Sequence, residues 1–515
     1  MNHFISPLSL LAIAVTTAAT AAAQQRPNVI FIVADDLGYG DLSCYGATRV
    51  QTPAVDRLAL RGTRFTDVHA CASTSTPSRY GLLTGCYPFR KKGTDVAAGN
   101  AGMIIRPEQF TLADLFQHAG YATAAIGKWH LGLGSTTATQ DWNGQLDMSL
   151  SDIGFDYSYI MAATADRVPC VFIENGHVAN YDPSAPIEVS YQKPFIGEPT
   201  GRQNPELLTK LKSSHGHDMA IVNGIGRIGY MRGGGKALWR DEDIADSITA
   251  HAIGFIQQHR SEPFFMYLCT NDVHVPRYPH DRFRGKSPMG LRGDAILQFD
   301  WTVEQVTATL ERLGLSDNTL IILTSDNGPV LDDGYADRAV ELAGTHTPGG
   351  PFRGGKYSAF EAGSAVPFIV CWPGHVPQGK TSRALVALTD ATASMASLIG
   401  ASIPFGQATD SRNYLSTWLG KKQKSCPYVV SMAANRSLTL RTSRWKFISA
   451  SDGPPIVPWG TGIETGYRST PQLYDMRHDS GERNDVSTRH SKLMKKLQQM
   501  LNQIVHDSTL TSYNP

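Results

Sequence analysis

The run Pro27-Asn-Val-Ile-Phe-Ile-Val-Ala34 is almost wholly apolar and ends abruptly at Asp35-Asp36. A strand-length run without alternating polar residues is typical of a strand that is buried on both faces of its sheet. The same design recurs in three later runs, which are Pro263–Thr270, Thr319–Ser325 and Val366–Trp372. The sequence therefore predicts four buried strands that are far apart along the chain.

Helical patterns lie between these runs. In Thr52-Pro-Ala-Val-Asp-Arg-Leu-Ala59, a threonine suited to an N-cap precedes a proline at the first helical position. Strands that alternate with helices indicate an α/β layer fold, in which helices sandwich a large, mostly parallel sheet. Ligands of such sheets bind beyond the carboxyl ends of the strands. Two polar pairs, Asp35-Asp36 and Asp326-Asn327, fall at such ends.

The pattern changes after Pro404, where the segments become short and alternating. We expect a small antiparallel sheet with one amphipathic helix here. The expected strands are Tyr428–Met432, Leu438–Arg441, Trp445–Ile448 and Gln472–Asp475, and the helix carries Leu493, Leu497, Met500, Leu501 and Ile504. The predicted domains are therefore an α/β catalytic domain over 24–404 and an α+β subdomain over 405–515.

The first residues have the character of an export signal. An apolar run over 5–15 is followed by small residues up to Ala23, so we expect a signal peptide over 1–23 and a periplasmic or secreted protein. No other apolar run is long enough to span a bilayer, so we expect no stable membrane insertion. The formal net charge of +1 over 515 residues argues against nucleic acid as a general partner.

The two polar pairs together predict a metal site. Asp35, Asp36, Asp326 and Asn327 would place only oxygen donors at neighbouring strand ends, and calcium is the hard cation that such a set suits. Either dipeptide alone is a common turn sequence. The seven cysteines have no C-x-x-C spacing, which argues against zinc and dithiol sites, and their odd number leaves at least one unpaired.

The run Cys71-Ala-Ser-Thr-Ser-Thr-Pro-Ser-Arg-Tyr-Gly-Leu-Leu-Thr-Gly85 predicts a hydroxyl nucleophile at the start of a helix. Thr76 is a suitable N-cap, Pro77 suits the first helical position and Gly85 suits the end. Ser75 would then lie beside a helix N-terminus, which favours an anionic ligand. The simpler alternative is a capped helix with two spare hydroxyls.

The same run resembles the signature of the type I sulfatases, which is Cys or Ser followed by x-Pro-Ser-Arg and then Thr-Gly. Ser75 matches the residue that these enzymes oxidise to formylglycine, and Arg79 matches the catalytic arginine. The resemblance implies an alkaline phosphatase-like fold, a calcium ion held by Asp35, Asp36, Asp326, Asn327 and the modified Ser75, and a sulfatase-maturating enzyme as partner. In the hydrated aldehyde, one hydroxyl attacks sulfur and the other then expels sulfate.

Further site residues follow from the resemblance. In Gly127-Lys-Trp-His-Leu-Gly132, Lys128 would hold sulfate oxygens and His130 would bond the formylglycine hydroxyl; on an extended segment the two side chains would point the same way. His274 would protonate the departing sugar oxygen, and Lys356 would be a further cation. Where relatives read E-G-G-x-R-V-P, this chain has Glu361-Ala-Gly-Ser-Ala-Val-Pro367, which puts the salt bridge of the missing arginine in doubt.

The stretch 135–250 has little periodicity and resembles a long functional insertion. Within it, Asp166-Arg167 and the residues up to His177 resemble segments of gut-bacterial carbohydrate exo-sulfatases, including galactose-3-O-sulfatases. On that likeness Asp166, Arg167 and His177 would contact the sugar, with His177 reading an axial hydroxyl. Arg353 is a second candidate for sugar hydroxyls. Each could equally be a structural polar residue.

We therefore expect a calcium-dependent formylglycine sulfatase that acts on a sulfated saccharide, with terminal 3-O-sulfated galactose as the first candidate. One alternative is a phosphate or phosphonate ester hydrolase of the same superfamily. Two-zinc members need further His and Asp ligands, whereas the histidines here fall in sulfatase motifs. The non-enzymatic alternative is a glycan-binding protein in which Ser75 stays unmodified.

Overall fold

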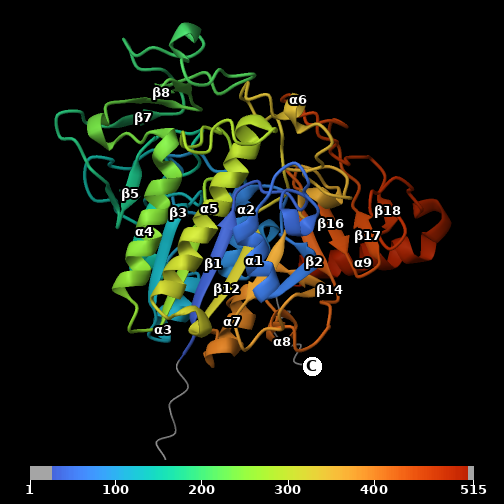
Figure 1. Cartoon of the computed structure of the whole chain (residues 1–515). Helices are drawn as coiled ribbons and strands as arrows, with labels where there is room; N and C mark the ends of the chain where they lie inside the picture. The colour runs from blue at the N-terminus through green and yellow to red at the C-terminus, as the bar shows by residue number, and fades with distance from the viewer. Residues whose placement is uncertain (1–25, 508–515) are drawn as a thin grey trace, which may run out of the picture.

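A ten-stranded sheet forms the centre of the protein in the computed structural model, which describes residues 26–507 (Figure 1). The proposed signal peptide lies outside the described residues. In spatial order the strands are β14 (Lys380–Ala387), β2 (Thr63–His69), β13 (Phe368–Cys371), β12 (Thr319–Ser325), β1 (Asn28–Ala34), β11 (Phe264–Cys269), β3 (Ala122–Lys128), β4 (Tyr157–Met161), β5 (Phe172–Glu174) and β6 (His177–Val178).

The predicted α/β fold is confirmed, and the sheet is mostly parallel. β1 lies between β11 and β12 and is parallel to both, and all seven of its residues are buried. β13 is the exception in the middle of the sheet, because it runs antiparallel to both β12 and β2. The four apolar runs are thus strands of one sheet.

Helices cover both faces of this sheet. Phe264 of β11 contacts Phe255 of α4 (Ile244–Gln258), whereas the next residue, Phe265, stacks on Phe116 of α3 (Leu112–His118). Successive strand residues point to opposite faces, so α4 and α3 lie on opposite sides.

The other helices extend these two layers. On the side of α4 lie α5 (Gly290–Arg312) and α1 (Pro53–Arg61), and on the side of α3 lie α2 (Ser75–Thr84) and α7 (Ala391–Ile399). Figure 1 shows α4 and α5 in front of β3 and β1. Two short helices, α6 (Ala339–Ala343) and α8 (Leu415–Trp418), lie outside these groups. As predicted, α1 begins at Pro53 after Thr52.

The expected second sheet is also present, in the order β15 (Val429–Met432), β16 (Leu438–Arg441), β17 (Trp445–Ile448) and β18 (Gln472–Asp475). Neighbouring strands in this sheet all run antiparallel to each other. Helix α9 (Ser491–His506) buries Leu497, Leu501 and Ile504 in the same cluster as Leu440 and Phe447. Trp418, which precedes this sheet, packs in the main core instead.

The stretch 135–250 contains more regular structure than its sequence suggests. β4, β5 and β6 extend the main sheet, and two small pairs form above it, β7 (Glu188–Ser190) with β10 (Tyr230–Arg232) and β8 (Ile221–Val222) with β9 (Ile225–Gly226). These strands have two to five residues, too few for a clear periodicity.

A buried charge network joins the two sheets at Glu361. Arg441 Nε of β16 lies 2.8 Å from Glu361 Oε1, and Lys446 Nζ of β17 lies 3.0 Å from Oε2. Burial would raise the pKa of Glu361, but Lys446, His69 and Arg441 together hold it well below its usual value. The second sheet therefore supplies two cations to Glu361.

Within residues 26–507, no helix is long and apolar enough to cross a membrane. The seven cysteines are all free thiols, and five of them are buried.

Candidate active site

The carboxyl ends of β1, β12 and β3 bring the predicted metal and sulfate residues together. Asp35 and Asp36 follow β1, Asp326 and Asn327 follow β12, and Lys128 is the last residue of β3. The Asp36 amide donates to Asp326 Oδ1 at 3.2 Å, which ties the two strand ends to each other. All five side chains are at most 2% exposed.

The Ser75 hydroxyl lies at the centre of these groups. Its Oγ is 2.6 Å from Lys128 Nζ and 3.4 Å from Asp35 Oδ1, and it also contacts Asp326 Oδ2. Ser75 is 2% exposed, and α2 begins at this residue. The Ser75 hydroxyl is therefore surrounded by one ammonium group and two carboxylates.

The predicted helix start is displaced by two residues. The N-cap of α2 is Thr74 in an extended conformation, so Pro77 lies at the third helical position. Thr76 does not cap the helix, because its hydroxyl donates to the His130 carbonyl oxygen at 2.9 Å. The end of the helix is as predicted, with Gly85 at φ 64° donating its N–H to Gly81.

We call the buried group of Ser75, Lys128 and the carboxylates and amide at the strand ends the floor of the site. Burial and neighbouring charges set the ionisation of its side chains. Loss of hydration raises the pKa of Asp35 and lowers the pKa of Lys128, and each partly offsets the shift of the other. Burial would also raise the pKa of Asp326, but Arg79 and Lys128 keep it well below its usual value. Arg79 is fully buried, with Nη2 2.8 Å from Asp326 Oδ2.

Lys356 occupies a second cationic position beside Asp36. Its Nζ is 2.8 Å from Asp36 Oδ2, 2.8 Å from Asp333 Oδ2 and 3.2 Å from His274 Nε2. Burial would lower the pKa of Lys356, but Asp333 and Asp36 raise it well above its usual value. Burial and Lys356 hold the pKa of His274 well below 6.5.

Four residues of the site have positive φ angles without being glycine. They are Asp36 at 56°, His130 at 61°, His217 at 50° and Tyr357 at 78°. Such strain persists only where the surroundings impose it, and it concentrates at functional sites. It also corrects the expectation for His130, because a residue at φ 61° does not continue an extended segment. His130 nevertheless lines the same cavity as Ser75, with Nε2 3.0 Å from the Ala97 carbonyl oxygen.

The donor set at the floor fits a hard cation. Asp35, Asp36 and Asp326 are three buried carboxylates, and the buried Asn327 Oδ1 has no hydrogen-bond partner. Ligand atoms of Asp35, Asp36 and His274 lie within 4.8 Å of one another. Oxygen-rich sets of this kind suit calcium. A second acidic cluster, Asp67, His69 and Glu361, is already neutralised by Arg441 and Lys446.

A cavity of about 670 Å³ opens above this floor. Ser75, His130, His274 and Lys356 lie at its base, and Asp166 and Arg167 form part of its wall. Its other polar lining groups were not predicted, and they are Thr74, Asp95, His215, His217, Asp333 and Tyr357. His217 Nε2 lies 3.0 Å from Asp166 Oδ2. Asp333 follows β12 by eight residues in Leu331-Asp-Asp-Gly334, which reads as an ordinary turn.

Two predicted sugar-contact residues lie elsewhere. His177 is exposed on β6, because the turn at Asn175-Gly176 places it at the outer edge of the main sheet. Arg353 pairs with Glu464 (Nε to Oε2, 2.7 Å) and donates to the Glu482 carbonyl oxygen. Neither residue lines the cavity.

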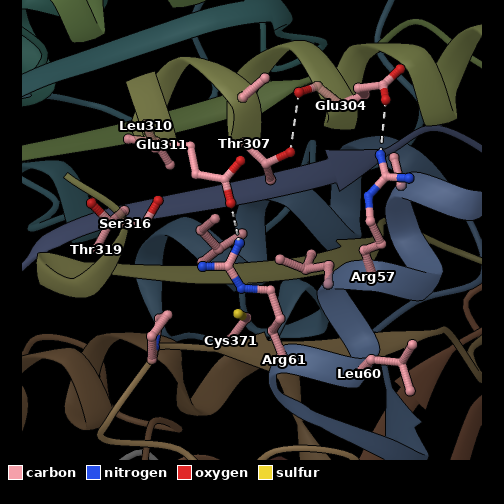
Figure 2. A pocket seen from close by; sticks show the side chains of 15 residues that line it. Arg57, Leu60, Arg61, Glu304, Thr307, Leu310, Glu311, Ser316, Thr319 and Cys371 are labelled. Carbon is pink, nitrogen blue, oxygen red and sulfur yellow. Dashed lines mark hydrogen bonds and ion pairs between the residues drawn. The ribbon is translucent and has the colours of Figure 1, made fainter. Parts of the chain in front are cut away.

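Figure 2 shows a different cavity, of about 490 Å³, between α1 and α5. It is crossed by two ion pairs, Arg57–Glu304 and Arg61–Glu311, each 2.8 Å long. Thr319 and Ile321 line it from the start of β12, whereas Asp326 follows the other end of that strand. This cavity therefore does not belong to the site.

The comparisons with known proteins agree with this geometry. A family model described as Sulfatase matches residues 27–401. The chain belongs to the sulfatase family. An N-acetylgalactosamine-6-O-sulfatase of Bacteroides thetaiotaomicron is 52% identical over 480 residues, which cover 93% of each chain. Human arylsulfatase A is 30% identical over 407 residues, covering 78% of this chain and 68% of the relative.

A solved structure supports the same assignment. It is described in connection with the metabolism of multiple glycosaminoglycans by Bacteroides thetaiotaomicron, and it superposes with a TM-score of 0.92 at 51% identity. The match covers 94% of this chain and 100% of the other. This sulfatase is accordingly a sulfuric ester hydrolase, as its sequence predicts.

Proposed function

We propose that this sulfatase removes a 6-O-sulfate group from a terminal N-acetylgalactosamine or a closely related sugar. The observation that carries the proposal is the buried floor around Ser75, where cations and a hydroxyl can receive a sulfate group below a cavity with polar walls. The sugar comes from the name of the relative that is 52% identical. The first candidate, 3-O-sulfated galactose, is not supported by the comparisons, and His177 lies outside the cavity.

The residues at the floor have distinct proposed roles. Lys128 and Lys356 would hold the sulfate oxygens and stabilise charge that develops on them. Ser75, oxidised to formylglycine and hydrated, would supply one hydroxyl that attacks sulfur and a second that expels sulfate. Arg79 would orient Asp326, to which it is bound. His130 would bond a hydroxyl at position 75 through Nδ1, which has no partner in the described structure.

His274 is the proposed proton donor to the leaving sugar oxygen. Its Nδ1 lies 2.6 Å from the Val275 carbonyl oxygen, so Nδ1 bears the hydrogen and Nε2 faces Lys356. The pKa of His274 is held well below 6.5, so the ring is neutral and Nε2 accepts a hydrogen bond from Lys356. The Lys356 ammonium group would protonate Nε2, and that proton would pass to the sugar oxygen as the sulfur–oxygen bond breaks, which would leave Lys356 neutral. Lys356, already bonded to Nε2, would keep that nitrogen oriented toward the cavity.

The metal proposed for the floor is calcium. Asp35, Asp36, Asp326 and Asn327 would hold it, together with the oxygen at position 75, and it would supply positive charge beside the sulfate group. Lys128 and Lys356 would contact the same sulfate oxygens, so binding of the sulfate group would not depend on the metal alone.

Asp166 and Arg167 would contact the sugar hydroxyls. Asp166 is 2% exposed and accepts hydrogen bonds from His217 and Arg167, which hold the carboxylate in one orientation. Burial would raise its pKa, but Arg167 and His217 keep it well below the usual value, so the group is ionised. An ionised, fixed acceptor can distinguish the orientation of a sugar hydroxyl.

Desulfation of defined saccharides tests the proposal. Purified enzyme should release sulfate from N-acetylgalactosamine 6-sulfate at least tenfold faster, in kcat/KM, than from galactose 3-sulfate, because the wall would be matched to one sugar. Faster turnover of the 3-sulfate would reverse the assignment of position. Comparison of nitrophenyl sulfate with nitrophenyl phosphate separates the sulfatase from a phosphate or phosphonate ester hydrolase.

Intact-peptide mass spectrometry across Ser75 tests the modification. Loss of two hydrogens would mark formylglycine, which requires a maturating enzyme in the producing cell. A preparation with unmodified Ser75 that binds sulfated glycans without turnover would match the glycan-binding alternative. Export, proposed from the first residues, is checked by locating the protein after cell fractionation.

A further inference from the structure

The mouth of the catalytic cavity exposes two large apolar side chains. Trp459 is 45% exposed and Val96 is 43% exposed, and both line the cavity that contains Ser75. Among the tryptophans of residues 26–507, Trp459 is the most exposed. Exposed aromatic surface that continues an active-site cavity indicates a contact with a ligand.

Trp459 is held against a fixed neighbour. Its ring packs edge-on against Tyr357, with 5.1 Å between ring centroids. The Tyr357 hydroxyl donates to Asp333 at 2.9 Å, its amide donates to the Ser73 carbonyl oxygen, and its own carbonyl oxygen accepts from Tyr467. A tyrosine bound at both ends cannot easily turn away, so the indole packs against a fixed surface.

The same contacts place Trp459 close to the sulfate floor. Lys356 Nζ lies 5.2 Å from the Tyr357 ring centroid, and the more exposed Trp459 ring packs against the same tyrosine. Because Lys356 and Trp459 line one cavity, a ligand that places its sulfate group beside Lys356 can reach the indole once it is longer than one sugar.

Two separate parts of the chain meet at this rim. Gly460 follows Trp459, and a side chain added there would lie 2.9 Å from His215 Nδ1, so the segment around 459 touches the loop at 213–218. That loop carries His215 and His217 in the cavity wall. The rim thus combines polar groups, His215 and Asp95, with the apolar side chains of Trp459 and Val96.

This combination of polar and apolar groups suits a pyranose ring. A sugar presents C–H groups on one face and hydroxyl groups around its edge, so it can lie on an indole while its edge meets polar groups. Tryptophan gives a large contact area at little loss of conformational entropy. A phosphate or sulfate group alone has no such apolar face and would gain nothing from Trp459.

We propose that Trp459 forms the platform of a second saccharide subsite, which binds the sugar linked to the one that bears the sulfate group. The proposal rests on the proposed action on saccharides, but it does not depend on the position of the sulfate group. It assigns the outer part of the cavity to a neutral or uronic sugar ring.

Substrate length tests the subsite. We compare the monosaccharide N-acetylgalactosamine 6-sulfate with a disaccharide in which this sugar is linked to a uronic acid. Trp459→Ala should lower kcat/KM on the disaccharide about tenfold, mainly through KM, because stacking of about 1.4 kcal/mol is lost. The monosaccharide and nitrophenyl sulfate should change less than twofold. Trp459→Phe should retain most of the disaccharide activity.

Phe405→Ala is the matched control, because Phe405 is 99% exposed and does not line the cavity. Equal losses on both saccharides in Trp459→Ala would overturn the subsite and would assign Trp459 to support of Tyr357. Unchanged kinetics on both would overturn it as well. Thermal melting of each variant excludes misfolding.

A binding experiment separates this proposal from the proposed function. The wild-type enzyme should bind the unsulfated disaccharide in calorimetry, and Trp459→Ala should weaken that binding about tenfold. If the enzyme turned over no sulfated sugar, the proposed function would fail, yet tryptophan-dependent binding would still support the subsite. No difference in binding between the variant and the wild type would contradict it.

Discussion

At Ser75, one hydroxyl meets an ammonium group and two carboxylates in a place that water hardly reaches. Lys128 Nζ is 2.6 Å away, and the serine is 2% exposed. In such surroundings electrostatic contacts are stronger than in water, and an unpaired charge is costly. The arrangement therefore suits a group whose charge changes during reaction more than it suits a structural hydroxyl.

Replacement of the nucleophile is the first prediction. Ser75→Ala should abolish turnover of every sulfate ester, with a loss of at least about 10⁴ in kcat, because a methyl group offers no oxygen to sulfur. The measurement is sulfate release, with circular dichroism to verify the fold. Ser73→Ala is the control, since the buried Ser73 hydroxyl has no hydrogen-bond partner in the described structure. Near wild-type turnover by Ser75→Ala would refute the assignment.

Substrates with different leaving groups distinguish the proposed role of His274 from that of the two lysines, Lys128 and Lys356. His274→Ala should lower kcat on a sulfated saccharide by about 10² to 10⁴, because a sugar oxygen needs a proton in the transition state. Nitrophenyl sulfate should lose far less, since nitrophenolate leaves without help. Lys128→Ala or Lys356→Ala should slow both substrates, because sulfate oxygens are common to both. Exposed His177→Ala should change neither.

Equal slowing of both substrates by His274→Ala would give a different answer. His274 would then be a sulfate-binding or structural histidine, and the proton donor would have to be another group of the cavity, with Lys356 as the nearest candidate.

At the level of elements, the first residues of α2 and α7 place polar groups in the interior of the protein. α2 brings Ser75 to the strand ends through its first residue, and α7 begins after a buried aspartate, Asp390. Asp390 Oδ1 accepts a hydrogen bond from the Arg412 amide at 2.9 Å. Burial raises the pKa of Asp390 to about 7, which Arg412 only partly offsets.

The free energy of unfolding should therefore depend on the ionisation of Asp390, and so on pH. The folded-state pKa of Asp390 lies above its unfolded value of about 3.8, so its contribution is complete below that value and is lost as pH rises toward about 7. Asp390→Asn should keep the hydrogen bond and remove this loss. We expect the variant to match the wild type near pH 4 and to be about 1–3 kcal/mol more stable at pH 8.

Urea unfolding at several pH values between 4 and 8 measures the effect. Asp147→Asn is the contrasting variant, because hydrogen bonds from Ser135 lower the pKa of the exposed Asp147. That variant should not gain stability as pH rises. A difference between Asp390→Asn and the wild type that did not vary with pH would contradict the assignment to Asp390.

At the level of the whole molecule, the site depends on elements that are distant in sequence. Asp36 follows β1 and Asn327 follows β12, and the Asn327 amide donates to Asp36 Oδ1 at 2.8 Å. A cation bound there would connect these two strand ends. The second sheet is connected to the main domain by buried ion pairs that Arg441 and Lys446 form with Glu361.

Removal of the metal should consequently affect stability as well as activity. Chelation should abolish turnover and lower Tm by several degrees, because a ligand bound only to the folded state stabilises it. Calcium should restore both better than zinc, since the donors are oxygens. Asn327→Ala should raise the calcium concentration needed for recovery. Recovery with zinc alone, or an unchanged Tm, would contradict a calcium site.

Local sequence determined a large part of this protein. The apolar run at 27–34 had to be a buried strand, because it lacks polar residues on either face, and it is β1. β12 has the predicted bounds for the same reason, whereas β16, β17 and β18 have them because their apolar and polar residues alternate. The sulfatase motifs likewise identified the family, and the structure brings Ser75, Lys128, His274 and Lys356 to one place.

Only the tertiary structure decided which polar residues share the cavity. His177 and Arg353 were plausible sugar contacts in sequence, yet a tight turn and a pair with Glu464 keep them out of it. His217, Asp333 and Trp459 enter the cavity instead, from loops whose sequences resemble ordinary turns. The reason is physical, since local sequence sets the conformation of a segment, whereas contacts between distant segments set which surface each loop meets.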